Sequence, residues 1–321
     1  MGTFVWSTTC SEIMYCDISQ GLALVSSLDT TPDPRLAPPL MEVRHAGSRH
    51  NAYPGETRVQ VDPSTLISFF DPALTSLTAA RHGLSRTQYR VARISQDDLD
   101  GVRTDIADMV ARDSGEKSGV DWRTLAQVIQ ERFADRLLYV RYLLYHARLV
   151  AANTSAAAQA HSQLQSITAA VRKQLVISLS PYMPREGIGE PAWFEATARG
   201  CATSFTAQTP STRFTKQERL LRYAVDEVLH EICRVYTEAW RDAFGFEMAR
   251  TDEAVDAIIS HPVLEKWRAA FDALIEWLDW PIWMKCDPAC AVDEFCEMPQ
   301  LAPWQTGEAQ PRCIAIDSGW V

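Results

Sequence analysis

Apolar residues recur at helical spacing from about residue 62 to residue 280. In the stretch 121–153, apolar side chains three and four positions apart form a continuous stripe, which is typical of an amphipathic helix. Strand-like alternation is nearly absent. The pattern therefore predicts an all-α fold, a single helical bundle domain of about eight helices. The expected helices cover residues 63–80 with an interruption at Pro72, 95–112, 121–153, 156–180, 191–199, 215–244 and 252–280.

Capping residues and prolines set the expected ends of these elements. Ser95 followed by Asp98 resembles a capping box. Gly245 is expected to end one long helix, and His261-Pro262 to interrupt the last one. The predicted organisation is an irregular N-terminal segment (1–60), an α-helical domain (61–280) and an irregular tail rich in Cys and Trp (281–321).

Composition narrows the class of protein. Acidic residues outnumber basic ones, 41 to 31, and the net charge of −10 argues against general nucleic-acid binding. No run of about 18 apolar residues is present, so no membrane span is expected. The first residues lack the charged and apolar regions of a signal peptide, which predicts a cytoplasmic protein.

The eight cysteines are then expected to be mostly free thiols. Cys286, Cys290, Cys296 and Cys313 lie close in sequence but do not form the two tight pairs of a structural zinc site. The sequon at Asn153 is meaningful only in a secreted protein.

Helix 121–153 carries a second set of apolar and aromatic residues on the face opposite its main stripe. Glu131 and Asp135 lie one turn apart on this face, followed by Tyr139 and Tyr142. A helix that is apolar on nearly all sides is expected to be buried in the centre of a bundle. Buried carboxylates need a metal, a proton or a basic partner, so the pair predicts either metal ligands or salt bridges to an arginine such as Arg141.

Helix 215–244 places Asp226 and His230 one turn apart, a spacing that suits joint binding of metal or phosphate. The alternative is an ordinary boundary stripe. Arg172 and Lys173 are candidate phosphate-binding cations, although basic residues are also favoured near a helix end. Lys285, next to the tryptophan-rich end of the helical region, is a further candidate substrate-binding residue.

Two acidic segments resemble the metal motifs of the fungal class I sesquiterpene cyclases. The run QDDLDG at Asp97-Asp98 precedes Asp226 by 129 positions, which is similar to the separation of that family's two motifs. Asp100 comes too early for the first motif, and His230 and Arg234 replace the second motif's hydroxyl and acid. With these departures the sequence is similar to a divergent group, the humulene synthases of fungal tropolone sesquiterpenoid pathways, which lack the usual motifs.

The resemblance implies ionisation of a prenyl diphosphate, with farnesyl diphosphate as the expected substrate and Mg²⁺ as cofactor. It also implies cyclisation in an aromatic-lined pocket. It implies Glu131, Asp135 and Asp226 as metal ligands, and Asp226 and His230 as catalytic residues. Substrate-binding residues would be Arg172, Lys173, Tyr139, Tyr142 and Lys285.

Two other functions stay open on the residues alone. Glu227 and His230 form an E-x-x-H motif, which keeps a helical di-iron oxidase as one alternative. A non-catalytic helical binding protein is the remaining alternative.

Overall fold

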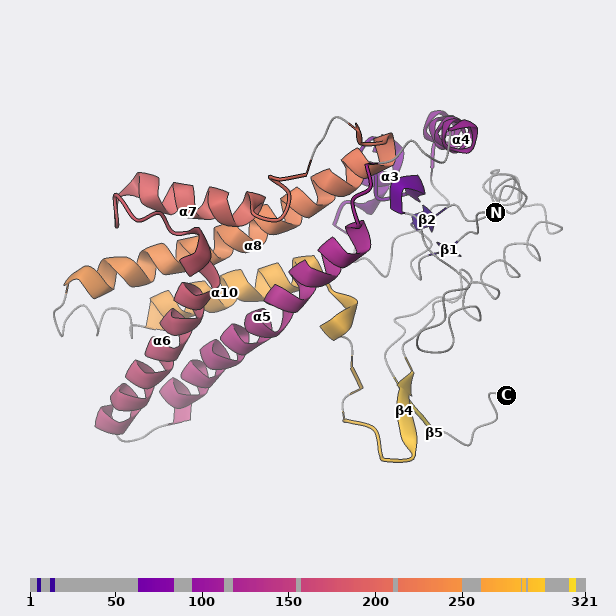
Figure 1. The fold of residues 1–321 in the computed structure, drawn as a ribbon. Coiled ribbons are helices and arrows are strands. Elements are labelled where there is room, and N and C mark those ends of the chain that lie inside the picture. Colours follow the sequence, from indigo (N-terminus) through magenta and orange to yellow (C-terminus); the bar gives the residue numbers. More distant parts are fainter. Residues whose placement is uncertain are drawn as a thin grey trace. The chain divides into compact units, whose positions relative to one another are not determined.

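The structure is a computed structural model. It describes residues 5–6, 12–14, 63–83, 94–112, 118–153, 157–209, 213–249, 261–283, 285–286, 288–297 and 312–315. Within these ranges the chain is mostly helical, which confirms the predicted helical character (Figure 1). None of the described helices has both the length and the apolar composition needed to cross a bilayer.

Seven α-helices, five short strands and three 3-10 turns make up the described elements. The helices are α3 (Thr75–Arg81), α4 (Gln96–Ala111), α5 (Trp122–Asn153), α6 (Ala157–Leu179), α7 (Pro191–Thr203), α8 (Lys216–Ala249) and α10 (His261–Leu278). The strands are β1 (Val5–Trp6), β2 (Glu12–Met14), β3 (Leu66–Ser68), β4 (Glu294–Glu297) and β5 (Arg312–Ala315). The 3-10 turns are η1 (Pro63–Thr65), η3 (Ser180–Tyr182) and η5 (Pro281–Trp283).

The chain divides into two compact units, whereas the sequence predicts one domain. The first unit comprises Met1–Val120, Pro210–Leu221 and Lys285–Val321, and the second comprises Asp121–Thr209 and Arg222–Met284. Helix α8 belongs to the first unit through Leu221 and to the second from Arg222. The boundaries drawn from the sequence at residues 61 and 280 stay predictions.

In the first unit, β1, β2 and β3 form an antiparallel sheet in which Ile67 pairs with Ile13. The helix expected from residue 63 is therefore wrong at its start. Pro72 disfavours helical geometry at Asp71, which leaves too few residues for a stable helix, and the apolar run of Leu66, Ile67 and Phe69 suits a buried strand. Helix α3 starts only after this proline. Strands β4 and β5 form a separate hairpin.

The second unit is built from α5, α6, α7, α10 and the greater part of α8. Figure 1 shows α5 and α6 as a hairpin, with α10 beside α5. Three fully buried rings join the long helices, because Tyr236 of α8 lies 6.3 Å from Phe133 of α5 and 5.2 Å from Phe271 of α10. Burial raises the pKa of the Tyr236 hydroxyl, which therefore stays neutral.

Helix α7 packs along α8 through a disulfide and an aromatic cluster. Cys201 bonds to Cys233, and Phe244 contacts both Trp193 and Phe194. The order of these contacts along the two helices shows that they are antiparallel. One covalent bond and several ring contacts therefore hold this pair of helices together.

The predicted helix ends hold at some positions and fail at others. The Asp98 amide donates to the Ser95 hydroxyl at 3.2 Å, as the capping pattern predicts. Helix α8 continues past Gly245 to Ala249, because an interior glycine costs only about 1 kcal/mol and does not by itself end a helix. Helix α10 begins at the expected break, His261, while residues 252–260 lie outside the described residues.

Candidate binding face on helix α5

Asp226 is held by two neighbours in the second unit. Its Oδ2 lies 2.6 Å from Arg222 Nε, and the buried hydroxyl of Thr206 donates to its Oδ1 at 2.5 Å. His230, one turn along α8, is exposed. Both carboxylate oxygens are therefore engaged by protein groups, an arrangement that fits a structural ion pair and leaves the catalytic roles of Asp226 and His230 as predictions.

The expectation that Glu131 and Asp135 are buried is wrong, because both side chains are exposed. Glu131 accepts a hydrogen bond from Gln127 on its own helix at 2.8 Å. Each acid is two residues from Phe133, which contacts α8, so each lies about 200° round the helix from that contact. Glu131 and Asp135 therefore point away from α8, and the structure does not bring them to Asp226.

Arg141 also differs from its expected pairing. Its Nε lies 2.9 Å from Asp272 of α10, and the Tyr145 hydroxyl donates to the same carboxylate at 3.0 Å. The guanidinium groups of Arg141 and Arg268 lie 5.5 and 5.4 Å from the Tyr145 ring. The contacts of Arg141 and Tyr145 with Asp272 and Arg268 join α5 to α10.

The exposed side of α5 forms a continuous surface, which we name the outer face. Tyr139 and Tyr142 lie at its centre with their rings stacked at 6.3 Å, and His146 lies 6.1 Å beyond Tyr142. Successive members are three or four residues apart, so they share one side of the helix. The outer face consists of Val128, Glu131, Asp135, Tyr139, Tyr142, His146 and Leu149.

Four large apolar side chains of the outer face are strongly exposed. The exposed fractions are 44% for Val128, 45% for Tyr139, 61% for Tyr142 and 58% for Leu149. The sequence finds these residues by their helical period but places them in the core. Periodicity shows that residues share a face, and it does not show whether another element covers that face.

The predicted phosphate-binding cations lie on elements other than α5. Arg172 is half-buried on α6, and Lys173 beside it is exposed. Lys285 is exposed in the first unit. Their roles as substrate-binding residues stay predictions.

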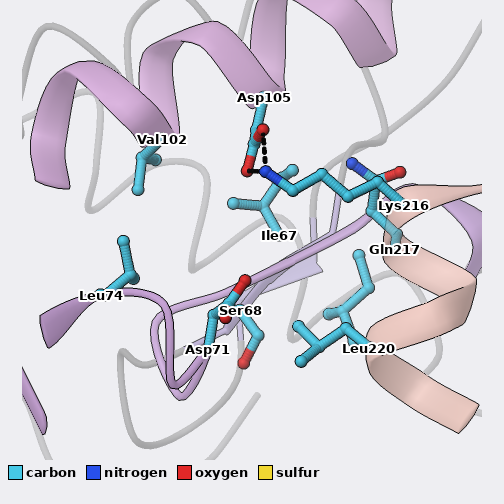
Figure 2. A pocket seen from close by; sticks show the side chains of 10 residues that line it. Ile67, Ser68, Asp71, Leu74, Val102, Asp105, Lys216, Gln217 and Leu220 are labelled. Atoms are coloured by element: carbon cyan, nitrogen blue, oxygen red, sulfur yellow. Dashed lines mark hydrogen bonds and ion pairs between the residues drawn. The ribbon is translucent and has the colours of Figure 1, made fainter. Parts of the chain in front are cut away.

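A pocket in the first unit was not expected from the sequence (Figure 2). Its empty space is about 330 Å³, part of which is open solvent. Lys216 and Asp105 form an ion pair in it, with Nζ 2.5 and 2.7 Å from the two carboxylate oxygens. Because the acid already neutralises this lysine, the pair is poorly suited to hold a diphosphate. Residues of β3, α4 and α8 line the pocket, and no sequence motif links these segments.

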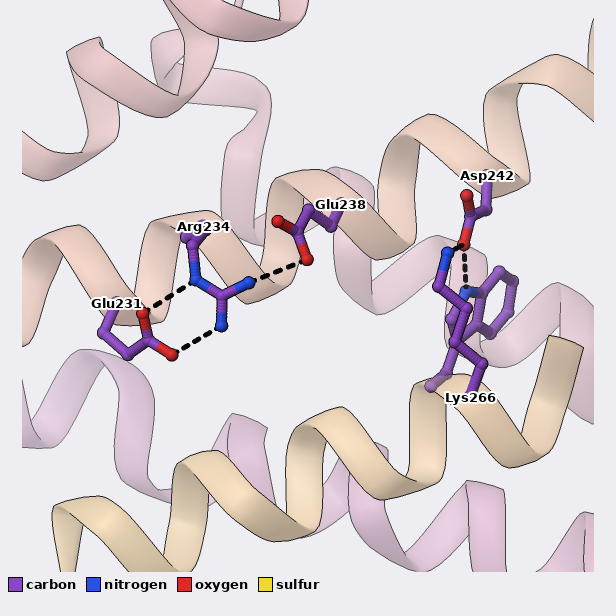
Figure 3. Close-up of polar contacts among 6 residues, drawn as sticks. Glu231, Arg234, Glu238, Asp242 and Lys266 are labelled. Atoms are coloured by element: carbon purple, nitrogen blue, oxygen red, sulfur yellow. Dashed lines mark hydrogen bonds and ion pairs between the residues drawn. The ribbon is translucent and has the colours of Figure 1, made fainter.

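Helix α8 carries polar contacts on its surface (Figure 3). Arg234 donates to Glu231 at 2.6 and 2.8 Å and to Glu238 at 2.8 Å. These hydrogen bonds, with the positive charge of Arg234, lower the pKa of Glu231. Further along, Asp242 accepts from Lys266 at 2.7 Å and from Trp267 Nε1 at 3.1 Å, which joins α8 to α10. The Arg234 cluster and the Asp242 cluster therefore both form their hydrogen bonds and ion pairs with other protein groups.

The expectation of free thiols is wrong for the six cysteines that the structure describes. Besides Cys201–Cys233, disulfides join Cys286 to Cys296 and Cys290 to Cys313. Cys296 and Cys313 are paired positions of β4 and β5, so the hairpin brings the four sulfurs together. The close spacing of cysteines after residue 285 was the available signal. The expectation of free thiols rests instead on the predicted cytoplasmic location.

Comparison with known proteins adds no assignment: no family model, curated protein or solved structure matches the chain. The class I cyclase fold, Mg²⁺ and a prenyl diphosphate substrate accordingly stay predictions.

Proposed function

We propose that the chain is a non-catalytic helical binding protein and that the outer face of α5 pairs with the same face of a second copy. The observation that carries this proposal is the exposure of Val128, Tyr139, Tyr142 and Leu149 on one side of one helix. An apolar row in water is unfavourable, and such rows on soluble domains mark interaction surfaces.

The composition of the outer face supports binding to protein. Tyrosine is enriched at protein interfaces because its ring supplies large contact area and its hydroxyl tolerates water. The stacked Tyr139 and Tyr142 form the centre of this face, and Asp135 and His146 flank them along the helix. Apolar and polar side chains therefore alternate along the face, with the aromatic pair at its centre, and aromatic residues at the centre of a contact are typical of protein interfaces.

The order of residues along the outer face favours a second copy as the partner. Asp135 and His146 are equally far in sequence from the midpoint between Tyr139 and Tyr142. An antiparallel two-fold pairing about this midpoint sets each Tyr139 against the other copy's Tyr142. It also sets each Asp135 beside the other copy's His146. A two-fold interface needs this kind of self-complementary surface.

Sedimentation equilibrium across a range of protein concentrations tests the pairing. The wild-type chain should show a concentration-dependent dimer, and the double variant Tyr139→Ser/Tyr142→Ser should weaken it by about tenfold or more, since central aromatic residues dominate interface energies. The matched control is Tyr223→Ser, which removes a tyrosine that is 55% exposed on α8 and away from the outer face. A wild-type chain that stays monomeric at all concentrations contradicts the proposal.

The cyclase and oxidase predictions have separate tests. Purified protein is incubated with farnesyl diphosphate and Mg²⁺, and released diphosphate and volatile hydrocarbons are measured. Turnover that is lost in Asp226→Asn while the fold is retained would replace the binding proposal with the cyclase. Stoichiometric bound iron in the purified protein would instead favour the di-iron oxidase.

A further inference from the structure

We infer that Asn153 is a site of N-linked glycosylation and that the protein matures in an oxidising secretory compartment. Asn153, Thr154 and Ser155 form an acceptor sequon. The sequon alone is weak evidence, because such tripeptides arise by chance in proteins that never meet the glycosylation machinery. The inference depends on two structural observations, the state of the cysteines and the position of Asn153.

The cysteines indicate the compartment. All six cysteines that the structure describes are in disulfide bonds. One of these bonds joins two packed helices across 32 residues of chain, and its sulfurs belong to the buried residues Cys201 and Cys233. Stable structural disulfides form in the secretory pathway and are rare in the cytosol, where thiols are kept reduced. Because N-glycans are added in the same oxidising lumen, the sequon and the disulfides point to one location.

Asn153 is placed where a glycan can be attached without disturbing the core. It is the last residue of α5, and α6 begins at Ala157. Its side chain is exposed, as are the preceding Ala151 and Ala152. An N-glycan is bulky and hydrated, so it is compatible only with a surface position of this kind. The end of the α5–α6 hairpin provides that position.

The modification itself is a simple transfer. The side-chain amide nitrogen of Asn153 forms a bond to C1 of an oligosaccharide carried on a lipid diphosphate. The bond between C1 and the diphosphate oxygen breaks, the lipid diphosphate leaves, and the amide nitrogen loses one proton. The Ser155 hydroxyl is the sequon group that the transferase requires.

The chain offers a clean measurement because it has only two asparagines. The other, Asn51, is followed by Ala52 and Tyr53, so it lacks the acceptor hydroxyl. A glycosylated chain should therefore carry one glycan. Any mass shift that an N-glycan-removing enzyme reverses then reports on Asn153 alone.

The test is expression of the full chain behind a cleavable secretion leader in a eukaryotic cell. The secreted wild type should show one mass shift that an N-glycan-removing enzyme reverses. N153Q and S155A should lose the shift, whereas S155T, which keeps the hydroxyl, and N51Q, the matched control, should retain it. A secreted, disulfide-bonded wild type without the shift overturns the inference, as does a shift that persists in N153Q or a wild-type chain whose cysteines stay reduced. Asn153 follows Leu149 by four residues, so a glycan there would lie at one end of the outer face, opposite the other copy's Val128 in the proposed pairing. The mass shift is measured on the denatured chain, so it reports glycosylation whether or not two copies pair.

Discussion

Gly189 is a residue at which the second unit has no space for a side chain. Its φ of +88° lies in the left-handed region, and a Cβ atom there would come within 2.7 Å of the Phe244 ring. That ring cannot move freely, because it packs against Trp193, Phe194 and Trp240. The sequence shows a loop at this position, but it does not show that an aromatic side chain from a helix 55 residues further along covers the glycine.

Replacing Gly189 with alanine should lower the free energy of unfolding by about 1–3 kcal/mol, from backbone strain and overpacking together. Urea denaturation followed by circular dichroism measures the change. The matched control is Gly101→Ala in α4, where no atom lies within 4 Å and the backbone is helical, so stability should rise by about 0.5–1 kcal/mol. A Gly189→Ala protein as stable as the wild type would show that the Phe244 cluster can yield.

Helix α5 illustrates how far a single element can be predicted. Its range, Trp122–Asn153, agrees with the expected 121–153, and most of its main stripe is buried as predicted, including Ile129, Phe133 and Leu137. The error concerns the opposite face. Tyrosine suits both a core and a wet surface, so Tyr139 and Tyr142 do not distinguish the two. Charged neighbours such as Glu131 were the better signal, since lone buried carboxylates are costly.

The ion pair between Glu231 and Arg234 on helix α8 should make the stability of the fold depend on pH. Because Arg234 lowers the pKa of Glu231 below its ordinary value of 4.5, the ion pair stabilises the fold at neutral pH. This contribution is lost as the pH falls below 4.5 and through the lowered value. Arg234→Gln should return the pKa of Glu231 toward 4.5 and cost about 0.5–1 kcal/mol at neutral pH, since the pair is partly exposed.

Side-chain NMR titration of Glu231 measures this pKa directly. Lys266→Gln serves as the control, because it removes another ion pair of α8 without touching Glu231. An unchanged Glu231 titration in Arg234→Gln would mean that the hydrogen bonds are not formed in solution.

At the scale of the whole molecule, the helical character could be predicted from the sequence, whereas the disulfide bonds could not. Helical periodicity is local and is repeated many times, so the predicted helices of the second unit are confirmed. Disulfide pairing joins residues far apart, such as Cys201 and Cys233, and spacing alone does not determine it. Whether the candidate metal ligands meet is also beyond the reach of local sequence patterns, because Glu131 and Asp226 belong to different helices whose relative rotation is set by packing.

The three disulfides among the described residues predict the number of reactive thiols in the 321-residue chain. Eight cysteines less the six in disulfides leave two, so alkylation in denaturant before reduction should modify no more than two residues. After reduction, all eight should react. Mass spectrometry counts the added groups. The second unit should also lose about 3–4 kcal/mol of stability on reduction, because the Cys201–Cys233 bond, with a sequence separation of 32, restricts a loop in the unfolded chain. Three or more reactive thiols in protein from an oxidising compartment would contradict the disulfide assignment. Such a count would also favour the cytoplasmic location expected from the sequence, since the two alternatives differ first in the state of these sulfurs.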